Sequence, residues 1–143
     1  MVTEWPLDHI GIAVTSIEEA RPLYERVTGA PGGPTLELPE QGVNVAFFGG
    51  IELLEPRGPE SSLARFFDSR GPGLHHMAFR VPDIAAELTR LEAAGVRLVD
   101  REPRIGAAGH PIAFLHPSAA GGVLVELVEV PVEPNPRFGV PSG

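Results

Sequence analysis

Two histidines and two glutamates are the residues of this chain best suited to hold a metal ion. His9, His76, Glu52 and Glu126 each lie in a short run of apolar residues. Two imidazoles and two carboxylates suit a borderline divalent cation and leave coordination positions for water or a substrate. The chain has no cysteine, so thiolate ligands are excluded. These four side chains are therefore the candidate ligands of an open metal site.

An alternative explanation exists for each of the four residues taken singly. A lone histidine beside apolar residues is usually an ordinary core or edge residue, and strand alternation could place either glutamate on a solvent-facing side. A carboxylate buried among apolar side chains, however, costs several kcal/mol unless it is paired or bound to a cation. Chance also does not explain why all four residues occupy matching positions of an internal repeat.

The repeat is visible in the sequence itself. One spacing relates the first two pairs of matching segments, and the third pair follows a longer connection through the turn Pro117–Gly122, where an insertion costs little. The matching pairs are His9–Ile17 with His76–Ile84, Val45–Phe48 with Ile112–Leu115, and Ile51–Glu55 with Val125–Glu129. The repeat equates His9 with His76 and Glu52 with Glu126.

Each copy is predicted to fold as a strand, a helix and three further strands, which is an α+β plan. Ser16 and Asp83 are placed to cap the helices at their N-termini, and Gly29 and Gly95 to end them. The predicted helices are Ile17–Thr28, Ile84–Ala94 and a short one at Ser61–Phe67. The predicted strands are Asp8–Val14, Thr35–Leu38, Gly42–Phe48, Ile51–Glu55, Leu74–Val81, Arg97–Asp100, Pro111–Leu115 and Val123–Val130.

The chain of 143 residues is long enough for two fused halves but not for two independent domains. We expect a single domain over residues 1–143, in which two tandem βαβββ modules form a curved mixed sheet around a metal-binding cleft. Module 1 is expected at about 7–56, the linker at 57–73, module 2 at about 74–130 and the tail at 131–143.

Charge and hydrophobicity exclude several classes of partner. A net charge of −8 argues against nucleic-acid binding, which requires clustered basic residues. No apolar run reaches the roughly 18 to 20 residues that a membrane span needs, and the N-terminus lacks the layout of a signal peptide. We expect a cytoplasmic protein without a nucleic-acid or membrane partner.

The remaining histidines are weaker candidates. His75 is expected to point away from His76 because neighbouring residues of a strand face opposite sides, and His75 and His116 are interpreted as surface or capping residues. His110 follows the glycine-rich segment Gly106–Gly109 and is a candidate substrate contact. That segment lacks the strand-to-helix context of a phosphate-binding loop, so it is not interpreted as a nucleotide motif.

From about Leu7 to Val130 the sequence resembles the vicinal oxygen chelate superfamily and, within it, the methylmalonyl-CoA epimerases. The segments that carry the resemblance are LDHIGIAV, PEQGVNVAFF, IELLEP, GLHHMAFRVPDI, EPRIGAAGHPIAFLHP and GGVLVELVE. The resemblance implies a homodimer with one divalent metal ion per chain, Co2+ first and Ni2+, Mn2+, Zn2+ or Fe2+ as alternatives. The metal ligands it implies are His9, Glu52, His76 and Glu126.

The function that the resemblance implies is interconversion of (2R)- and (2S)-methylmalonyl-CoA by α-proton abstraction through a metal-stabilised enolate. Glu126 is the expected catalytic base on one face, and Glu52 is the candidate on the other. Some epimerases have Gln at the position of Glu52 and an acidic residue where this chain has Val45, so the second base stays open. Gln41 is a candidate substrate contact, and either Gln41 or a metal-bound water is the fallback for that base.

The acyl-CoA substrate carries phosphates that arginine side chains are suited to bind. The candidates are Arg57, Arg65, Arg70, Arg101 and Arg104. Two alternatives remain on the same scaffold, glyoxalase I and a non-catalytic, drug-sequestering resistance protein. Exchange of the α-proton of methylmalonyl-CoA would exclude the first, and a metal content below about one ion per two chains would favour the second.

Overall fold

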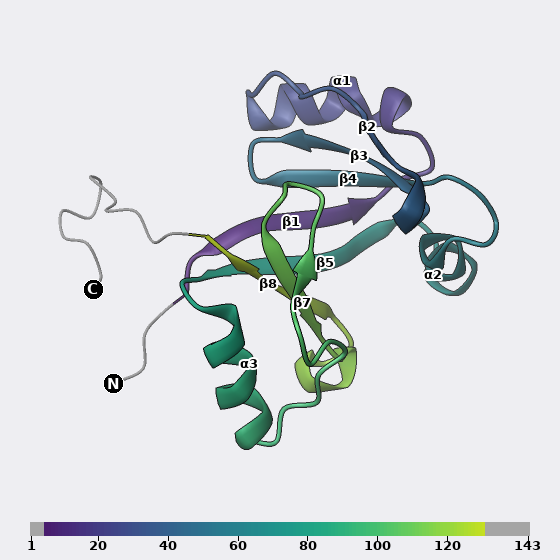
Figure 1. Cartoon of the computed structure of the whole chain (residues 1–143). Helices are drawn as coiled ribbons and strands as arrows, with labels where there is room; N and C mark the ends of the chain where they lie inside the picture. The colour runs from purple at the N-terminus through teal and green to yellow at the C-terminus, as the bar shows by residue number, and fades with distance from the viewer. Residues whose placement is uncertain (1–4, 131–143) are drawn as a thin grey trace, which may run out of the picture. The chain divides into compact units, whose positions relative to one another are not determined.

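The computed structural model describes residues 5–130, which divide between two compact units. The first unit is His9–His76, and the second joins Met77–Gly143 to Met1–Asp8. The predicted tail, 131–143, lies outside the described residues. Figure 1 shows the helices and strands of both units. The chain follows the βαβββ order twice, as the repeat predicted.

The first unit contains a mixed sheet in the order β2-β3-β4-β1. Strand β1 pairs in parallel with β4, whereas β2 with β3 and β3 with β4 are antiparallel. The elements are β1 (Leu7–Ala13, from His9 in this unit), α1 (Ile17–Thr28), β2 (Leu36–Leu38), η1 (Pro39–Gln41), β3 (Val43–Phe48), β4 (Ile51–Pro56) and α2 (Ser62–Arg70).

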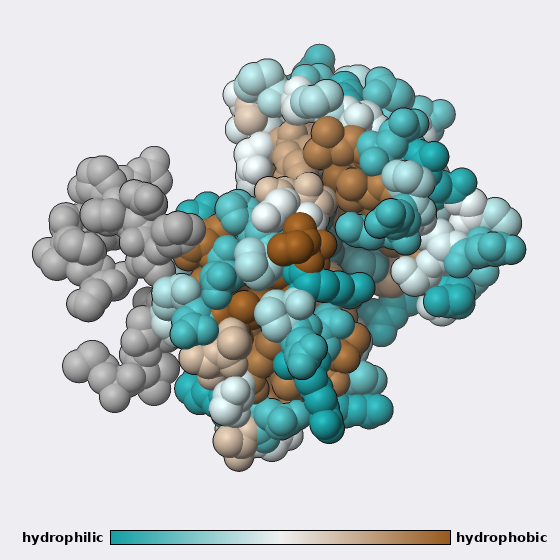
Figure 2. Space-filling model, viewed as in Figure 1, coloured by the Kyte–Doolittle hydropathy of each residue, from teal (hydrophilic) through white to brown (hydrophobic). Residues whose placement is uncertain are grey.

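Helix α1 begins and ends where its capping residues predicted. The Ser16 hydroxyl accepts a hydrogen bond from the Glu19 N–H at 3.2 Å, and Gly29 ends the helix with a φ of 71°. The helix packs on β3 and β4, and Ile17 contributes to the core cluster with Ala46, Phe48 and Leu53. Hydrophilic residues lie along the top of Figure 2, where α1 runs, although Leu23 and Val27 of this helix are also exposed.

The second unit repeats this plan with strands in the order β5-β8-β7-β6. Asp83 caps the helix by accepting a hydrogen bond from the Ala86 N–H at 3.1 Å. The elements are β5 (Gly73–Val81, from Met77 in this unit), α3 (Ile84–Ala93), β6 (Arg104–Ile105), β7 (Pro111–Leu115), η2 (Pro117–Ala120) and β8 (Leu124–Glu129). The core of this unit contains Val81, Ile84, Leu88, Ala113, Leu115 and Leu127.

Most predicted strand boundaries differ from the structure by one residue, and three elements need further comment. The predicted strand Arg97–Asp100 is wrong, because β6 is a two-residue strand at Arg104–Ile105. Helix α2 runs from Ser62 to Arg70, with Ser61 as its N-cap, and is longer than predicted. Helix α3 ends at Ala93 with Ala94 in the cap position, and Gly95 follows with a φ of 86°.

The α+β class with two βαβββ modules and mixed strand pairing is confirmed. The described helices are all too short or too polar to cross a bilayer. That the whole chain folds as one domain stays a prediction.

Candidate metal centre

Three of the four candidate ligands meet in the first unit. The Nε2 atoms of His9 and His76 lie 3.1 Å apart, and the Glu52 Oε1 atom lies 3.4 Å from the first and 3.2 Å from the second. All three residues are buried, with exposed fractions of 8%, 2% and 6% for His9, His76 and Glu52. Residues far apart in sequence therefore converge at the ends of their side chains.

The spacing of these three atoms fits a metal ion. Donors that each lie about 2.0 to 2.2 Å from one cation are about 2.8 to 3.6 Å from one another in octahedral or tetrahedral geometry. The observed separations, 3.1, 3.2 and 3.4 Å, all fall inside that interval. Two neutral imidazoles and one carboxylate also provide the donor types that borderline divalent cations prefer.

Gly11 makes room for the His76 ring. Residue Gly11 pairs with Glu52 in the register of β1 and β4. A Cβ atom on Gly11 would lie 2.1 Å from Cε1 of His76, far inside van der Waals contact. The role of Gly11 was not predicted from the sequence, although a glycine inside a strand can mark a place where another group approaches closely.

The environment of Glu52 keeps its carboxylate ionised. Burial raises the pKa of Glu52, but hydrogen bonds from His76 and His9 and their charges outweigh that effect and lower the pKa to about 2. The side chain is therefore an anion at neutral pH. A buried anion facing two imidazoles is poised to accept a cation.

His75 is not the surface residue that strand alternation predicted. Its Nδ1 atom lies 2.9 Å from Nδ1 of His76, and its ring packs on Phe66 of α2 with centroids 4.9 Å apart. Nδ1 is the ring nitrogen nearer the backbone, so the two imidazoles contact each other through the edges nearer the backbone. Burial and the charge of His76 lower the pKa of His75 from 6.5 to about 4, although Glu52 acts in the opposite direction.

The fourth candidate ligand lies in the second unit. Glu126 is 6% exposed on β8, beside the buried Leu127 and Val128, and is paired in register with Phe114 of β7. Burial of this carboxylate among apolar neighbours is the environment that the sequence predicted. Its donor type and its burial keep Glu126 a candidate metal ligand.

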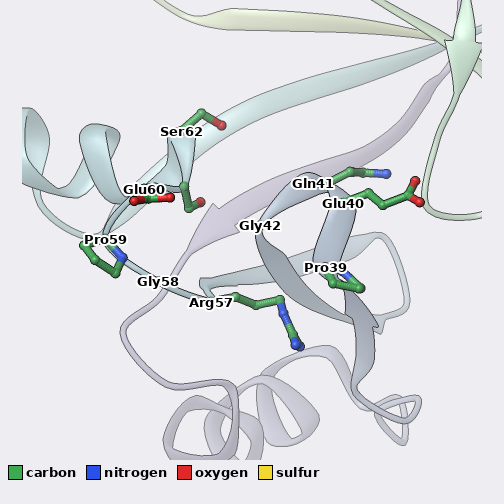
Figure 3. Close-up of a pocket in the computed structure, with 10 residues that line it drawn as sticks. Pro39, Glu40, Gln41, Gly42, Arg57, Gly58, Pro59, Glu60 and Ser62 are labelled. Carbon is green, nitrogen blue, oxygen red and sulfur yellow. The ribbon is translucent and has the colours of Figure 1, made fainter.

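Gln41, the predicted substrate contact of the first unit, lines a pocket of about 600 Å³. The segments Pro39–Gly42 and Arg57–Ser62 form its walls (Figure 3). His9, Glu52 and His76 are not among its lining residues. Arg57 is thus the candidate phosphate-binding arginine that lies in this pocket, where its guanidinium donates to Oδ1 of Asn44 at 2.7 Å.

The other predicted positions have simpler surroundings. His110 is exposed at the turn between β6 and β7, where the Gly106 N–H donates to its carbonyl at 2.9 Å. His116 caps η2 by accepting the Ser118 N–H at 3.1 Å, so its interpretation as a capping residue is confirmed. Val45 is 1% exposed on β3 and has no group that could carry a proton.

A second pair of glutamates also occupies matching repeat positions but has a structural role. Glu55 accepts a hydrogen bond from the Ile17 N–H at 2.7 Å, and Glu129 accepts one from the Ile84 N–H at 3.0 Å. Each carboxylate therefore binds the N-terminus of the helix in its own unit. The role of this pair was not predicted from the sequence, although the repeat places both residues at equivalent positions.

Known proteins resemble this chain over most of its length. It is 41% identical to the mitochondrial methylmalonyl-CoA epimerase of Bos taurus, a match that covers 85% of this chain and 72% of that protein. It is 42% identical to the ethylmalonyl-CoA/methylmalonyl-CoA epimerase of Cereibacter sphaeroides, covering 87% and 97%.

Solved structures agree with these relatives. The crystal structure of methylmalonyl-CoA epimerase from Mycobacterium tuberculosis matches with a TM-score of 0.79 at 40% identity, over 89% of this chain and 88% of that one. A methylmalonyl-CoA epimerase in complex with methylmalonyl-CoA and NH4+ matches with a TM-score of 0.80 at 35% identity, over 89% and 95%. The Glyoxalase/Bleomycin resistance protein/Dioxygenase superfamily profile matches residues 8–114. The resemblance seen in the sequence is thereby confirmed, and the chain belongs to this superfamily.

Proposed function

We propose that this protein is a methylmalonyl-CoA epimerase that binds one divalent cation through His9, Glu52, His76 and Glu126. The observation that carries the proposal is the set of three buried donor atoms at metal-ligand separations, in a chain that resembles methylmalonyl-CoA epimerases over most of its length. Glu126 enters the proposal through its burial, its donor type and its equivalence to Glu52 in the repeat.

The proposed reaction removes the α-proton of methylmalonyl-CoA from one face and returns a proton to the other. The difficulty is the negative charge that develops on the thioester oxygen when the proton leaves. A divalent cation, when bound, supplies Lewis-acid stabilisation of that charge. The buried positions of the ligands would exclude bulk water and strengthen this electrostatic effect.

The proton carriers must stand on opposite faces of the α-carbon. We assign Glu126 to one face and Glu52 to the other as the candidate. The low pKa of Glu52 makes it a weak base and suits it better to holding a cation. Because Val45 has no proton to exchange, no carrier comes from that position, and either Gln41 or a bound water is the fallback partner of Glu126.

The substrate contacts proposed from the sequence remain Gln41 and His110. Gln41 and Arg57 line one pocket, which makes that pocket the candidate site for the polar part of the acyl-CoA. Support for an acyl-CoA substrate comes from the solved epimerase that holds methylmalonyl-CoA. A homodimer and a cytoplasmic location are also proposed, and size-exclusion chromatography and cell fractionation test them.

Exchange of the α-proton in deuterated buffer tests the reaction and the two carriers. The wild-type protein should incorporate deuterium into (2R)- and (2S)-methylmalonyl-CoA while interconverting them. Glu126→Gln should abolish interconversion, since one carrier is gone, and should leave exchange for one epimer only. Mass spectrometry with chiral analysis of the product measures both. Absence of exchange in the metal-loaded wild-type protein would refute the epimerase, and a glyoxalase would leave that carbon untouched.

Glu52→Gln separates the two roles of Glu52 in the same assay. Weakened metal binding with full interconversion after reloading would support a ligand role alone, whereas exchange confined to one epimer after reloading would make Glu52 a proton carrier as well. Retention of the full epimerase rate would remove Glu52 from the carriers. Metal analysis of the wild-type protein should give about one ion per chain, and the reconstitution series should begin with Co2+. A content below about one ion per two chains would favour a non-catalytic binder.

A further inference from the structure

His76 has contacts at both nitrogens of its imidazole ring. Its Nε2 atom faces His9 Nε2 at 3.1 Å and Glu52 Oε1 at 3.2 Å. Its Nδ1 atom faces Nδ1 of His75 at 2.9 Å, which is a hydrogen-bond distance. The side of the ring away from the candidate ligands is thus also engaged.

The chemistry of imidazole decides the direction of this hydrogen bond. A neutral histidine carries one N–H, and a metal ligand must offer a lone pair on the nitrogen that faces the ion. If His76 binds through Nε2, its proton is on Nδ1 and must be donated to an acceptor. The nearest ring nitrogen on that side is Nδ1 of His75, which accepts when its own proton is on Nε2.

We propose that His75 is a positioning residue, which fixes the tautomer and the ring orientation of His76 for metal binding. The inference rests on the metal site of the proposed function and adds a residue that binds no metal itself. Outer partners of this kind typically change metal affinity by about 10- to 100-fold when removed.

The surroundings of His75 hold its ring in place. The ring of Phe66 packs against it at an interplanar angle of 69°, and the rings of His75 and His76 meet at 86°. Phe66 belongs to α2 and both histidines to the first residues of β5. A fixed acceptor orients the His76 ring better than exchangeable water would, because water would leave the ring free to rotate.

Two substitutions separate the hydrogen bond from the packing. His75→Phe keeps a ring against Phe66 but removes the acceptor, whereas His75→Asn loses the ring but places a carbonyl oxygen near the position of Nδ1. The matched control is His116→Asn, which changes a histidine that caps η2. Urea unfolding of each variant without metal reports whether it is folded.

Titration with Co2+ alone, followed by its visible absorption, measures the effect independently of epimerase activity. His75→Phe should weaken Co2+ binding by about 10- to 100-fold and change the absorption spectrum, while His75→Asn should stay within about threefold of wild type. The control should match wild type. Wild-type affinity and spectrum in His75→Phe would overturn the proposal, as would a wild-type protein that does not bind Co2+.

Nitrogen NMR of the wild-type protein loaded with Zn2+ provides a measurement that needs no variant. His76 should show a protonated Nδ1 and a metal-bound Nε2, and the reverse pattern would overturn the proposal. A wild-type protein that binds Co2+ with the expected His75 dependence but does not exchange the α-proton of methylmalonyl-CoA would refute the proposed function alone.

Discussion

The residue that most directly limits the position of His76 is a glycine. Gly11 has no side chain, and any Cβ at this position would overlap the imidazole, with 2.1 Å to Cε1 and 2.3 Å to Nδ1. The strand itself tolerates alanine, so the cost of substitution falls on the ring that must move. A displaced His76 would no longer share the short separations with His9 and Glu52.

We therefore predict that Gly11→Ala lowers the affinity for Co2+ by at least about tenfold. Calorimetric titration measures this affinity. Gly33→Ala is the control, because a Cβ at Gly33 would meet only the Phe47 carbonyl oxygen at 3.6 Å, an ordinary contact. Equal affinities for the two variants would show that His76 does not depend on the space above Gly11.

At the scale of elements, the carboxylates of Glu55 and Glu129 hold helices onto strands. Glu55 has two contacts, with the Ile17 N–H at 2.7 Å and with Nδ2 of Asn44 at 2.8 Å, so it links α1, β3 and β4. Glu129 accepts the Ile84 N–H at 3.0 Å and links α3 to β8. A charged acceptor at a helix N-terminus also interacts favourably with the helix dipole.

Glu55→Ala should lower the free energy of unfolding by about 2 to 3 kcal/mol, because it removes two hydrogen bonds to a charged group. Glu129→Ala should cost about 1 to 2 kcal/mol, because we expect it to lose mainly the bond to Ile84. Urea denaturation measures both. The exposed Glu102→Ala should change stability by less than about 0.5 kcal/mol. A Glu55 variant as stable as the Glu102 variant would contradict this role.

The elements that the sequence predicted well depend on local signals. Ser16 and Asp83 cap their helices by accepting hydrogen bonds from residues three positions later in the sequence. Interactions over so short a range can be predicted from the sequence. The strand predicted at Arg97–Asp100 did not form, because the contact of this segment with β7 is a single bridge and not a continuous ladder. Asp100 uses its carboxylate to accept the Phe114 N–H at 2.9 Å, which replaces a ladder bond, and Leu98 forms only an isolated bridge to Leu115.

The candidate site was accessible to sequence reasoning for a different reason. The repeat equated His9 with His76, and apolar neighbours indicated the burial of Glu52. Residue types and their positions in the repeat were therefore sufficient to predict these candidate ligands. The roles of Gly11 and His75 were not accessible. They depend on how one ring packs against a neighbouring strand and against the preceding residue, which alternation along an ideal strand does not describe.

At the scale of the whole molecule, burial of His75 links stability to pH. The pKa of His75 falls from 6.5 to about 4 on folding, mainly through burial and then through the charge of His76. Between these values the unfolded chain binds a proton that the folded chain does not, so stability decreases as pH falls from about 6.5 towards 4. Glu52, with a pKa of about 2, acts in a lower range, below its ordinary 4.5.

We predict that the free energy of unfolding of the metal-free protein falls by about 2 to 3 kcal/mol more between pH 7 and pH 4.5 than that of His75→Phe. Urea unfolding at the two pH values, with a chelator present, measures the difference. His116→Phe serves as the control, since its ring lies outside the candidate centre. Parallel pH dependence in wild type and His75→Phe would mean that His75 is protonated equally in both states.

Strand β4 carries two glutamates with different roles, which has a practical consequence for protein engineering. Glu52 of this strand faces two imidazoles, whereas Glu55 accepts a hydrogen bond from the N-terminus of α1. Replacing Glu52 by a neutral residue should therefore prevent metal binding while the protein stays folded. A metal-free receptor for thioesters could then be built on this backbone, provided that Glu55 and Glu129 are excluded from any randomised library.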